Sequence, residues 1–239
     1  MAGAVPEWSA SSTPSLKAAG YKSPNEKLNI AVIGAGQRAQ VDVPACENEN
    51  LVAFADPDDA NAAFIYNRYP TQPKFRDYRR MLDREGKNID AVMIITPDHM
   101  HAAAALWCME RGKHVFVEKP LARTIWETRL LMESAERYKV ATQMGNQGYS
   151  YEATRVACEI MWSGEIGAVT EVHAWTDRPV WPQGLQSPPP EAKVPDTLDW
   201  DTWLGVAKMR PYSPGYLPFT GTGSSISAAE HWVIWPATF

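Results

Sequence analysis

An acid, an amine and a proline come directly after a short apolar run in HVFVEKP, at Glu118, Lys119 and Pro120. Apolar, β-branched runs of this kind form strands that are buried on both faces of a parallel sheet, and Pro120 stops the strand and fixes the following turn. Because the carboxyl end of such a strand faces a ligand-binding crevice, Lys119 could hydrogen-bond a hydroxyl there and take its proton, with Glu118 orienting the amine. A solvated ion pair at a strand end is the ordinary alternative, and this motif alone does not separate the two.

A glycine-rich turn, GAGQRA, lies between the first apolar run and the first helical stretch. Gly34 suits a tight turn, Gly36 would let a pyrophosphate approach backbone N–H groups, and the small Ala39 allows a helix to pack closely on a strand. The helix N-terminus offers its partial positive charge to the phosphates. This pattern predicts a dinucleotide site rather than a glycine turn without a ligand.

Asp56 supplies the acid that such a site needs. It lies roughly 20 residues past Gly36, at the end of the second predicted strand, where it could accept hydrogen bonds from a ribose 2′-hydroxyl. Asp56 would repel a 2′-phosphate and no arginine follows it directly, so NAD is predicted and NADP is less favoured. Lys119 would then point at the nicotinamide end of the bound dinucleotide.

A further polar motif, TPDHMH, ends another predicted strand on the same side of the sheet. Thr96 and Pro97 could lie against the cofactor, while Asp98 or His99 caps the next helix. The spacing of His99 and His101 invites a metal interpretation. No cysteine or further histidine supplies the remaining ligands, so no metal site is predicted.

Apolar runs and helical patterns alternate through the first part of the chain, which indicates parallel βαβ units and a doubly wound α/β sheet of the Rossmann type. A helix near 151–164 and a strand with one exposed face over 168–177 are predicted next, followed by a long loop rich in Pro and Trp. The predicted strands of the sheet are 28–34, 51–56, 89–97, 114–120 and 139–145.

The composition excludes several classes of protein. Hydrophobic residues make up 45% of the 239 residues and charged residues 21%, which is ordinary for a soluble globular chain. A net charge of -5 gives no basic field, so nucleic acid is not expected as a partner. The three cysteines form no C-x-x-C motif, which excludes a disulfide framework and a structural zinc site. No apolar run is long enough to span a membrane.

Five motifs in this order and spacing, NIAVIGAGQRA, ADPDD, IITPDHMH, VFVEKPLA and QMGNQ, resemble the Gfo/Idh/MocA oxidoreductases. The resemblance runs from about residue 28 to 219, and LDWDTWLG resembles a segment of that family's second domain. It implies a Rossmann domain followed by an α/β domain on an open sheet, here incomplete. It also implies oxidation of a sugar or polyol hydroxyl by hydride transfer to NAD(P), and a homo-oligomer as a possible assembly.

The resemblance also assigns site residues. It places Lys119 in the catalytic set, with Lys119 also touching the cofactor. Together with the residues chosen from their own chemistry, it predicts a cofactor cleft made of Gly34, Gly36, Arg38, Ala39, Asp56, Thr96, Pro97, His99, Glu118 and Asn146.

Four segments are expected along the chain. Residues 1–27 read as a mobile arm rich in Ala, Ser and Pro, 28–147 as the dinucleotide-binding domain, and 148–219 as the start of a substrate domain. The arm is similar to the end of an export signal whose charged and apolar regions are missing. A cytoplasmic location is therefore expected, and a periplasmic one if a longer N-terminus exists.

The last segment, 220–239, departs from the resemblance. The family's D-x-x-x-H pair, whose His acts as acid/base partner to the lysine, is not found in the chain. Plausible codons for this tail, read in a shifted frame, encode G-A-L-G-D-M-A-C-H, which looks like the missing segment. We therefore expect a reading-frame shift near Thr220, which would make Glu230 and His231 accidents of the shifted frame rather than catalytic residues.

Three functions are consistent with these observations. The first is an NAD-dependent oxidoreductase acting on a small sugar or polyol. A variant of it is glycoside cleavage in which oxidation of the sugar acidifies a neighbouring C–H. The third, from a different class, is a nucleotide-binding fragment or pseudoenzyme without turnover, which the missing D-x-x-x-H pair favours for this chain.

Overall fold

The computed structural model describes residues 27–175 and 189–216. The predicted arm, except for Lys27, and the predicted out-of-frame tail over 220–239 lie outside the described residues. So does the part of the predicted long loop that precedes residue 189. Among the described helices, none is long and apolar enough to cross a membrane.

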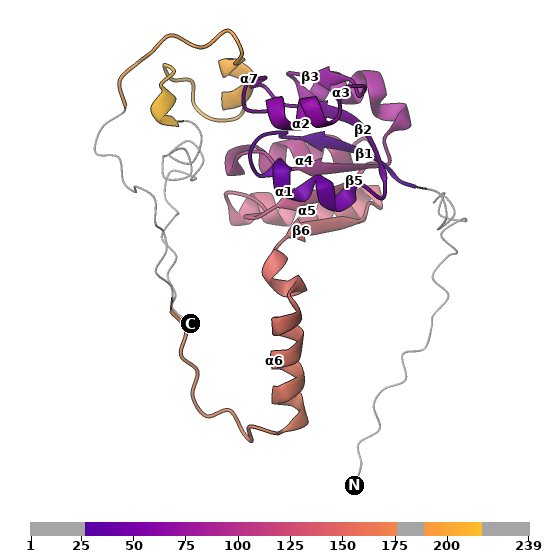
Figure 1. Cartoon of the computed structure of the whole chain (residues 1–239), viewed down its shortest axis with the longest axis vertical. Helices are drawn as coiled ribbons and strands as arrows, with labels where there is room; N and C mark the ends of the chain where they lie inside the picture. The colour runs from indigo at the N-terminus through magenta and orange to yellow at the C-terminus, as the bar shows by residue number, and fades with distance from the viewer. Residues whose placement is uncertain (1–26, 176–188, 217–239) are drawn as a thin grey trace.

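Six parallel strands form one open sheet in the order β3-β2-β1-β4-β5-β6 (Figure 1). This is the order of a doubly wound Rossmann sheet, in which the chain starts in the middle and winds outward in both directions. The predicted α/β fold class is confirmed. The two-residue strand β3 was not predicted, because so short a segment carries no periodic pattern. The strands are β1 (Asn29–Ile33), β2 (Asn50–Ala55), β3 (Lys74–Phe75), β4 (Ala91–Ile94), β5 (His114–Glu118) and β6 (Thr142–Gly145).

Helices cover both faces of this sheet, each face with its own apolar cluster. One cluster joins the strands to α3, α4 and α5. The other joins Val32 and Phe54 to Ala39 of α1 and Ile65 of α2. Burying a side chain of this size stabilises the fold by about 2 kcal/mol. The helices are α1 (Ala39–Asp42), α2 (Ala63–Arg68), α3 (Tyr78–Glu85), α4 (His101–Met109) and α5 (Ile125–Tyr138).

Local sequence explains where these helices begin and end. α1 has only four residues because Pro44 follows and starts a separate 3-10 turn, Pro44–Cys46. α5 begins with a capping box in which the Thr124 hydroxyl accepts a bond from the Glu127 N–H and the Glu127 carboxylate accepts one from the Thr124 N–H.

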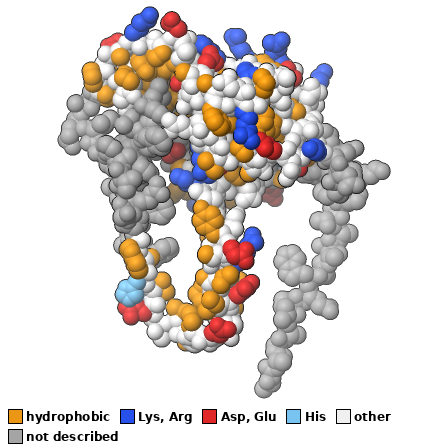
Figure 2. Space-filling view, viewed as in Figure 1, with side chains coloured by type: hydrophobic (Ala, Val, Ile, Leu, Met, Phe, Trp, Pro, Cys, Tyr) orange, Lys and Arg blue, Asp and Glu red, His pale blue; other side chains and the backbone are white. Residues whose placement is uncertain are grey.

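The helix α6 (Glu152–Ser163) projects away from the sheet (Figure 1) and has no buried residue. Hydrophobic side chains gather along it (Figure 2), including the exposed Trp162. The prediction of a strand over 168–177 is wrong for residues 168–175, which form no strand. Alternating residues become a strand only beside a hydrogen-bonding neighbour, and no other described segment pairs with them; residues 176 and 177 lie outside the described part.

Residues 189–216 return to the side of the sheet (Figure 1) and bind the loop that follows β2, where the Asp59 N–H donates to the Thr197 carbonyl oxygen and the Asp199 N–H to that of Pro57. Their helix, α7 (Trp200–Leu204), starts at Asp199, whose carboxylate accepts a bond from the Thr202 N–H at 3.0 Å. Stacked indole rings of Trp200 and Trp203, 5.0 Å apart, centre a small apolar cluster. A segment that is far away in sequence thus forms part of the molecule's surface beside the sheet's carboxyl edge.

Candidate cofactor-binding site

A cleft of about 560 Å³ lies at the carboxyl edge of the sheet. Its walls come from the turns that follow β1, β2, β4 and β5, and from α7 and Tyr216. The predicted site residues that line it are Gly34, Gly36, Arg38, Asp56, Thr96, Pro97, Glu118 and Lys119.

The glycine turn forms the floor of this cleft. Gly34 has φ +89°, and a Cβ there would lie 2.5 Å from the Ile95 carbonyl oxygen, so the close approach of β1 and β4 requires glycine. A Cβ on Gly36 would lie 2.2 Å from Nδ2 of Asn61. Ala39 is fully buried under the turn, as the predicted close packing of helix on strand requires.

Asp56 lies at the end of β2 with its carboxylate buried, 5% exposed. One oxygen accepts a hydrogen bond from the Ala35 N–H at 2.8 Å and the other from the Asp58 N–H at 2.9 Å. Burial raises the pKa of Asp56 to about 7, against the lowering effect of these two bonds. The acid therefore ties the glycine turn to the loop after β2 and still borders the cleft.

The turn after β4 brings Thr96 and Pro97 to the cleft. The Thr96 hydroxyl is buried and has no hydrogen-bond partner among the described residues. His101 fixes the turn from behind, because its Nε2 lies 2.8 Å from the Thr96 carbonyl oxygen and its Nδ1 lies 2.6 Å from that of Pro120. The buried imidazole thereby joins the ends of β4 and β5.

Glu118 and Lys119 end β5 at the opposite side of the cleft. Lys119 is exposed, and the peptide bond from Lys119 to Pro120 is cis. Glu118 is buried and contacts the Arg38 guanidinium at 3.2 Å and the Lys119 backbone N–H at 3.1 Å. We predicted that Glu118 orients the lysine amine, and the structure differs: the Glu118 carboxylate contacts the Arg38 guanidinium and the Lys119 backbone N–H instead.

His99 and Asn146 do not line the cleft. His99 is buried at 1% exposure, its Nε2 donates to the Trp203 carbonyl oxygen at 3.1 Å, and burial lowers its pKa to about 4. The prediction that Asp98 or His99 caps the next helix is wrong, since neither side chain makes a capping bond. Residues 98–100 instead form a 3-10 turn that leads directly into α4.

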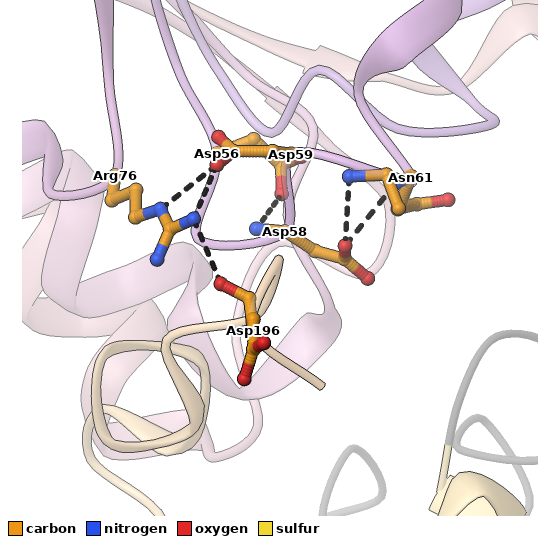
Figure 3. Close-up of polar contacts among 7 residues, drawn as sticks. Asp56, Asp58, Asp59, Asn61, Arg76 and Asp196 are labelled. Atoms are coloured by element: carbon orange, nitrogen blue, oxygen red, sulfur yellow. Dashed lines mark hydrogen bonds and ion pairs between the residues drawn. The ribbon is translucent and has the colours of Figure 1, made fainter. Parts of the chain in front are cut away.

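Several cleft residues escaped the sequence interpretation. Arg76 follows β3, and Figure 3 shows it beside Asp59 and Asp196. Gln147 lines the cleft, whereas the residue predicted from the QMGNQ motif was its neighbour Asn146. Trp203 and Tyr216 reach the cleft from the distant 189–216 segment, which no local pattern could place there.

These features fit a dinucleotide. The cleft volume falls within the range of ligand pockets, roughly 300–1,000 Å³. The orphaned Thr96 hydroxyl offers an unused hydrogen bond, and Gly36 lines the cleft without a side chain, next to the amide of Asn61. Among the described residues, no group of His, Cys, Asp and Glu side chains is arranged to hold a metal ion.

A Rossmann sheet with a glycine turn after β1 and an acid after β2 defines a dinucleotide-binding domain. The model of the Gfo/Idh/MocA family, described as an oxidoreductase family with an NAD-binding Rossmann fold, matches residues 28–146. The chain belongs to this family, and residues 28–146 are its NAD-binding Rossmann domain.

Relatives of this chain include dehydrogenases and a glycosidase. A levoglucosan dehydrogenase from Pseudarthrobacter phenanthrenivorans is 27% identical over 157 residues, 60% of this chain and 39% of the relative. An alpha-N-acetylgalactosaminidase from Shewanella oneidensis is 44% identical over 144 residues, 55% of this chain and 31% of the relative. The structure of myo-inositol 2-dehydrogenase from Lactobacillus plantarum superposes with a TM-score of 0.55 at 26% identity, covering 59% of this chain and 43% of that one. The matched part of the chain thus spans less than half the length of each of these relatives.

Proposed function

We propose that this chain is the cofactor-binding part of an NAD-dependent oxidoreductase that transfers hydride between the nicotinamide and a sugar or polyol hydroxyl. One observation carries the proposal: a single cleft of about 560 Å³ has the Asp56 carboxylate in one wall and Lys119 in another. Similarity to proteins named for levoglucosan and myo-inositol supports a polyhydroxylated substrate.

Each end of the cleft has its own role in this proposal. Asp56 would accept hydrogen bonds from the adenosine ribose, Gly34 would permit the tight turn, and Gly36 would let the phosphates approach the backbone. Bound NAD⁺ supplies a hydride acceptor for the carbon that carries the reacting hydroxyl. Lys119 would hydrogen-bond that hydroxyl and take its proton. Glu118 would keep the strand end in place through its bonds to Arg38 and to the Lys119 backbone.

Glycoside cleavage is the second candidate, and the identity of 44% to an alpha-N-acetylgalactosaminidase favours it. In this reaction the same hydroxyl oxidation would acidify a neighbouring C–H bond of the sugar. Loss of that proton would help to expel the group on the adjacent carbon. The same lysine would serve both reactions, so the two candidates differ in substrate rather than in site.

Nucleotide titrations followed by turnover assays would test these proposals. NADH fluorescence measures binding to the full chain, and NADH absorbance measures turnover with a panel of sugars, polyols and aryl glycosides. Release of the phenol from an aryl glycoside without net NADH would identify glycoside cleavage, because water would replace the phenol and the hydride would return to the sugar. NADH binding without turnover of any substrate would favour the inactive nucleotide-binding alternative, and no NADH binding would refute the proposal.

We further propose that residues 148–219 begin a substrate domain. The exposed apolar side chains of α6 support this, because an amphipathic helix normally buries that face against another element. Limited proteolysis should cut after residue 147 while 28–147 stays intact. Equal resistance of both parts would contradict this boundary.

A further inference from the structure

An ion pair stands at the adenosine end of the cleft, just beyond Asp56 (Figure 3). Arg76 donates to Asp59 Oδ2 from Nε at 2.9 Å and from Nη2 at 2.5 Å. The same Nη2 also donates to the Asp196 carbonyl oxygen at 3.1 Å. The guanidinium is thus held by two partners from different parts of the chain.

Arg76 is placed where it matters for the nucleotide. It lines the cleft together with Asp56, Pro57 and Asn61, which form its adenosine end. An arginine near the acid that binds the ribose is what accommodates a 2′-phosphate in NADP-binding Rossmann sites. In this chain the arginine is present, but it already forms an ion pair with Asp59.

Side chains of both charges surround Arg76. A second groove of about 670 Å³ adjoins the cleft and shares Arg76 and Thr202 with it. Three acidic side chains line this groove: Asp77, Asp83 and Asp199. Five cationic side chains line it: Lys74, Arg76, Arg79, Arg80 and Arg84. With Asp59 paired to Arg76 and Asp56 in the adjoining cleft, the acidic side chains beside Arg76 balance these cations.

We propose that Asp59 is a cofactor-specificity residue, which excludes NADP by engaging the Arg76 guanidinium. This inference rests on the proposed placement of the nucleotide. A 2′-phosphate would have to separate Arg76 from Asp59 and would then lie near two acids, Asp56 and Asp59. NAD carries no such phosphate and leaves the ion pair intact. The preference for NAD is thereby set by two acids and one neutralised arginine rather than by Asp56 alone.

Replacement of Asp59 tests this directly. NADH and NADPH are titrated against the full chain by fluorescence, for the unaltered protein and for Asp59→Ala. The ratio of the NADPH and NADH dissociation constants should fall about tenfold in Asp59→Ala, because a freed guanidinium can pair with the phosphate. Asp59→Asn, which keeps a hydrogen-bond acceptor but loses the charge, should give a smaller fall.

Two further variants separate this mechanism from a general charge effect. Adding Arg76→Leu to Asp59→Ala should cancel the gain in NADPH binding. Glu47→Ala changes the net charge equally by breaking the surface pair with Arg68, 2.6 Å apart, and should leave the ratio unchanged. An unchanged ratio in both folded Asp59 variants, or a gain that survives Arg76→Leu, would overturn the inference. Failure of the unaltered chain to bind NADH would instead overturn the proposed function, and this inference with it.

Discussion

The two ends of the cleft are built in different ways. At the adenosine end, the Asp56 carboxylate is buried and accepts two backbone hydrogen bonds, and residues 196–199 pack against the loop that follows it. At the other end, Lys119 is exposed and its backbone N–H donates to Glu118. Its amine has no hydrogen bond among the described residues, but it lies near enough to Asp98 to offset part of the rise that burial causes in the pKa of that carboxyl. The acid of one end is fixed by backbone hydrogen bonds, whereas the other end presents an exposed amine to solvent. This difference suits a site that obtains affinity at one end and performs chemistry at the other.

Replacement of Lys119 should have the largest effect of the variants considered, and it should lower turnover without changing the adenosine end of the cleft. Under the proposed function, Lys119→Met should lower kcat about a thousandfold, because general acid–base groups contribute roughly 10²–10⁴ in rate. NADH affinity should change by no more than a few-fold, since the lysine works on the reacting hydroxyl.

Lys87→Met is the matched control, because Lys87 is exposed and lies far from the cleft. Its kcat should stay at the level of the unaltered chain. If Lys119→Met kept most of its kcat, Lys119 would be an ordinary strand-end cation. The division of the cleft into a binding end and a reacting end would then be contradicted.

The sequence predicted the parts of the cleft that follow from local patterns. Gly34 and Asp56 could be found because each ends a buried apolar strand, and in a parallel sheet strand ends share one edge. Arg76 could not be found, since β3 has two residues and no periodicity. Trp203 could not be found either, because it meets His99 across 104 residues of sequence. Contacts of that kind depend on packing between distant segments rather than on local preference.

Protonation of His99 in acid should weaken the packing of α7 at the cleft. Burial lowers the pKa of His99 to about 4, from 6.5, so docking of α7 is fully stabilised above pH 6.5 and loses that stability as pH falls toward 4. Between pH 7 and pH 5 the loss is about 2 kcal/mol, or roughly twentyfold in the docking equilibrium. Hydrogen exchange of the backbone amides in 199–205 measures it.

His99→Gln keeps a donor for the Trp203 carbonyl and removes the titration, so its exchange in 199–205 should not depend on pH beyond the intrinsic rate. Amides of β1 serve as an internal reference. Burial raises the pKa of Asp56 to about 7, so its contribution has the opposite sign: it is present in acid and lost as pH rises through 7. Equal protection of 199–205 at both pH values would show that His99 does not control the docking of α7.

Thr96 lies between the two ends and should give the smallest effect. Its hydroxyl is buried at the cleft without a hydrogen-bond partner among the described residues, so the free protein gains nothing from it. Thr96→Val should leave the free energy of unfolding unchanged or raise it by up to about 1 kcal/mol. If the cofactor is the missing partner, NADH affinity should fall roughly three- to tenfold, the worth of one hydrogen bond.

Thermal unfolding and NADH titration of the same samples measure both quantities, and Thr142→Val, on the exposed strand β6, controls for the substitution itself. Loss of stability together with loss of affinity would show that the hydroxyl supports the fold, whereas unchanged affinity would place the cofactor away from Thr96.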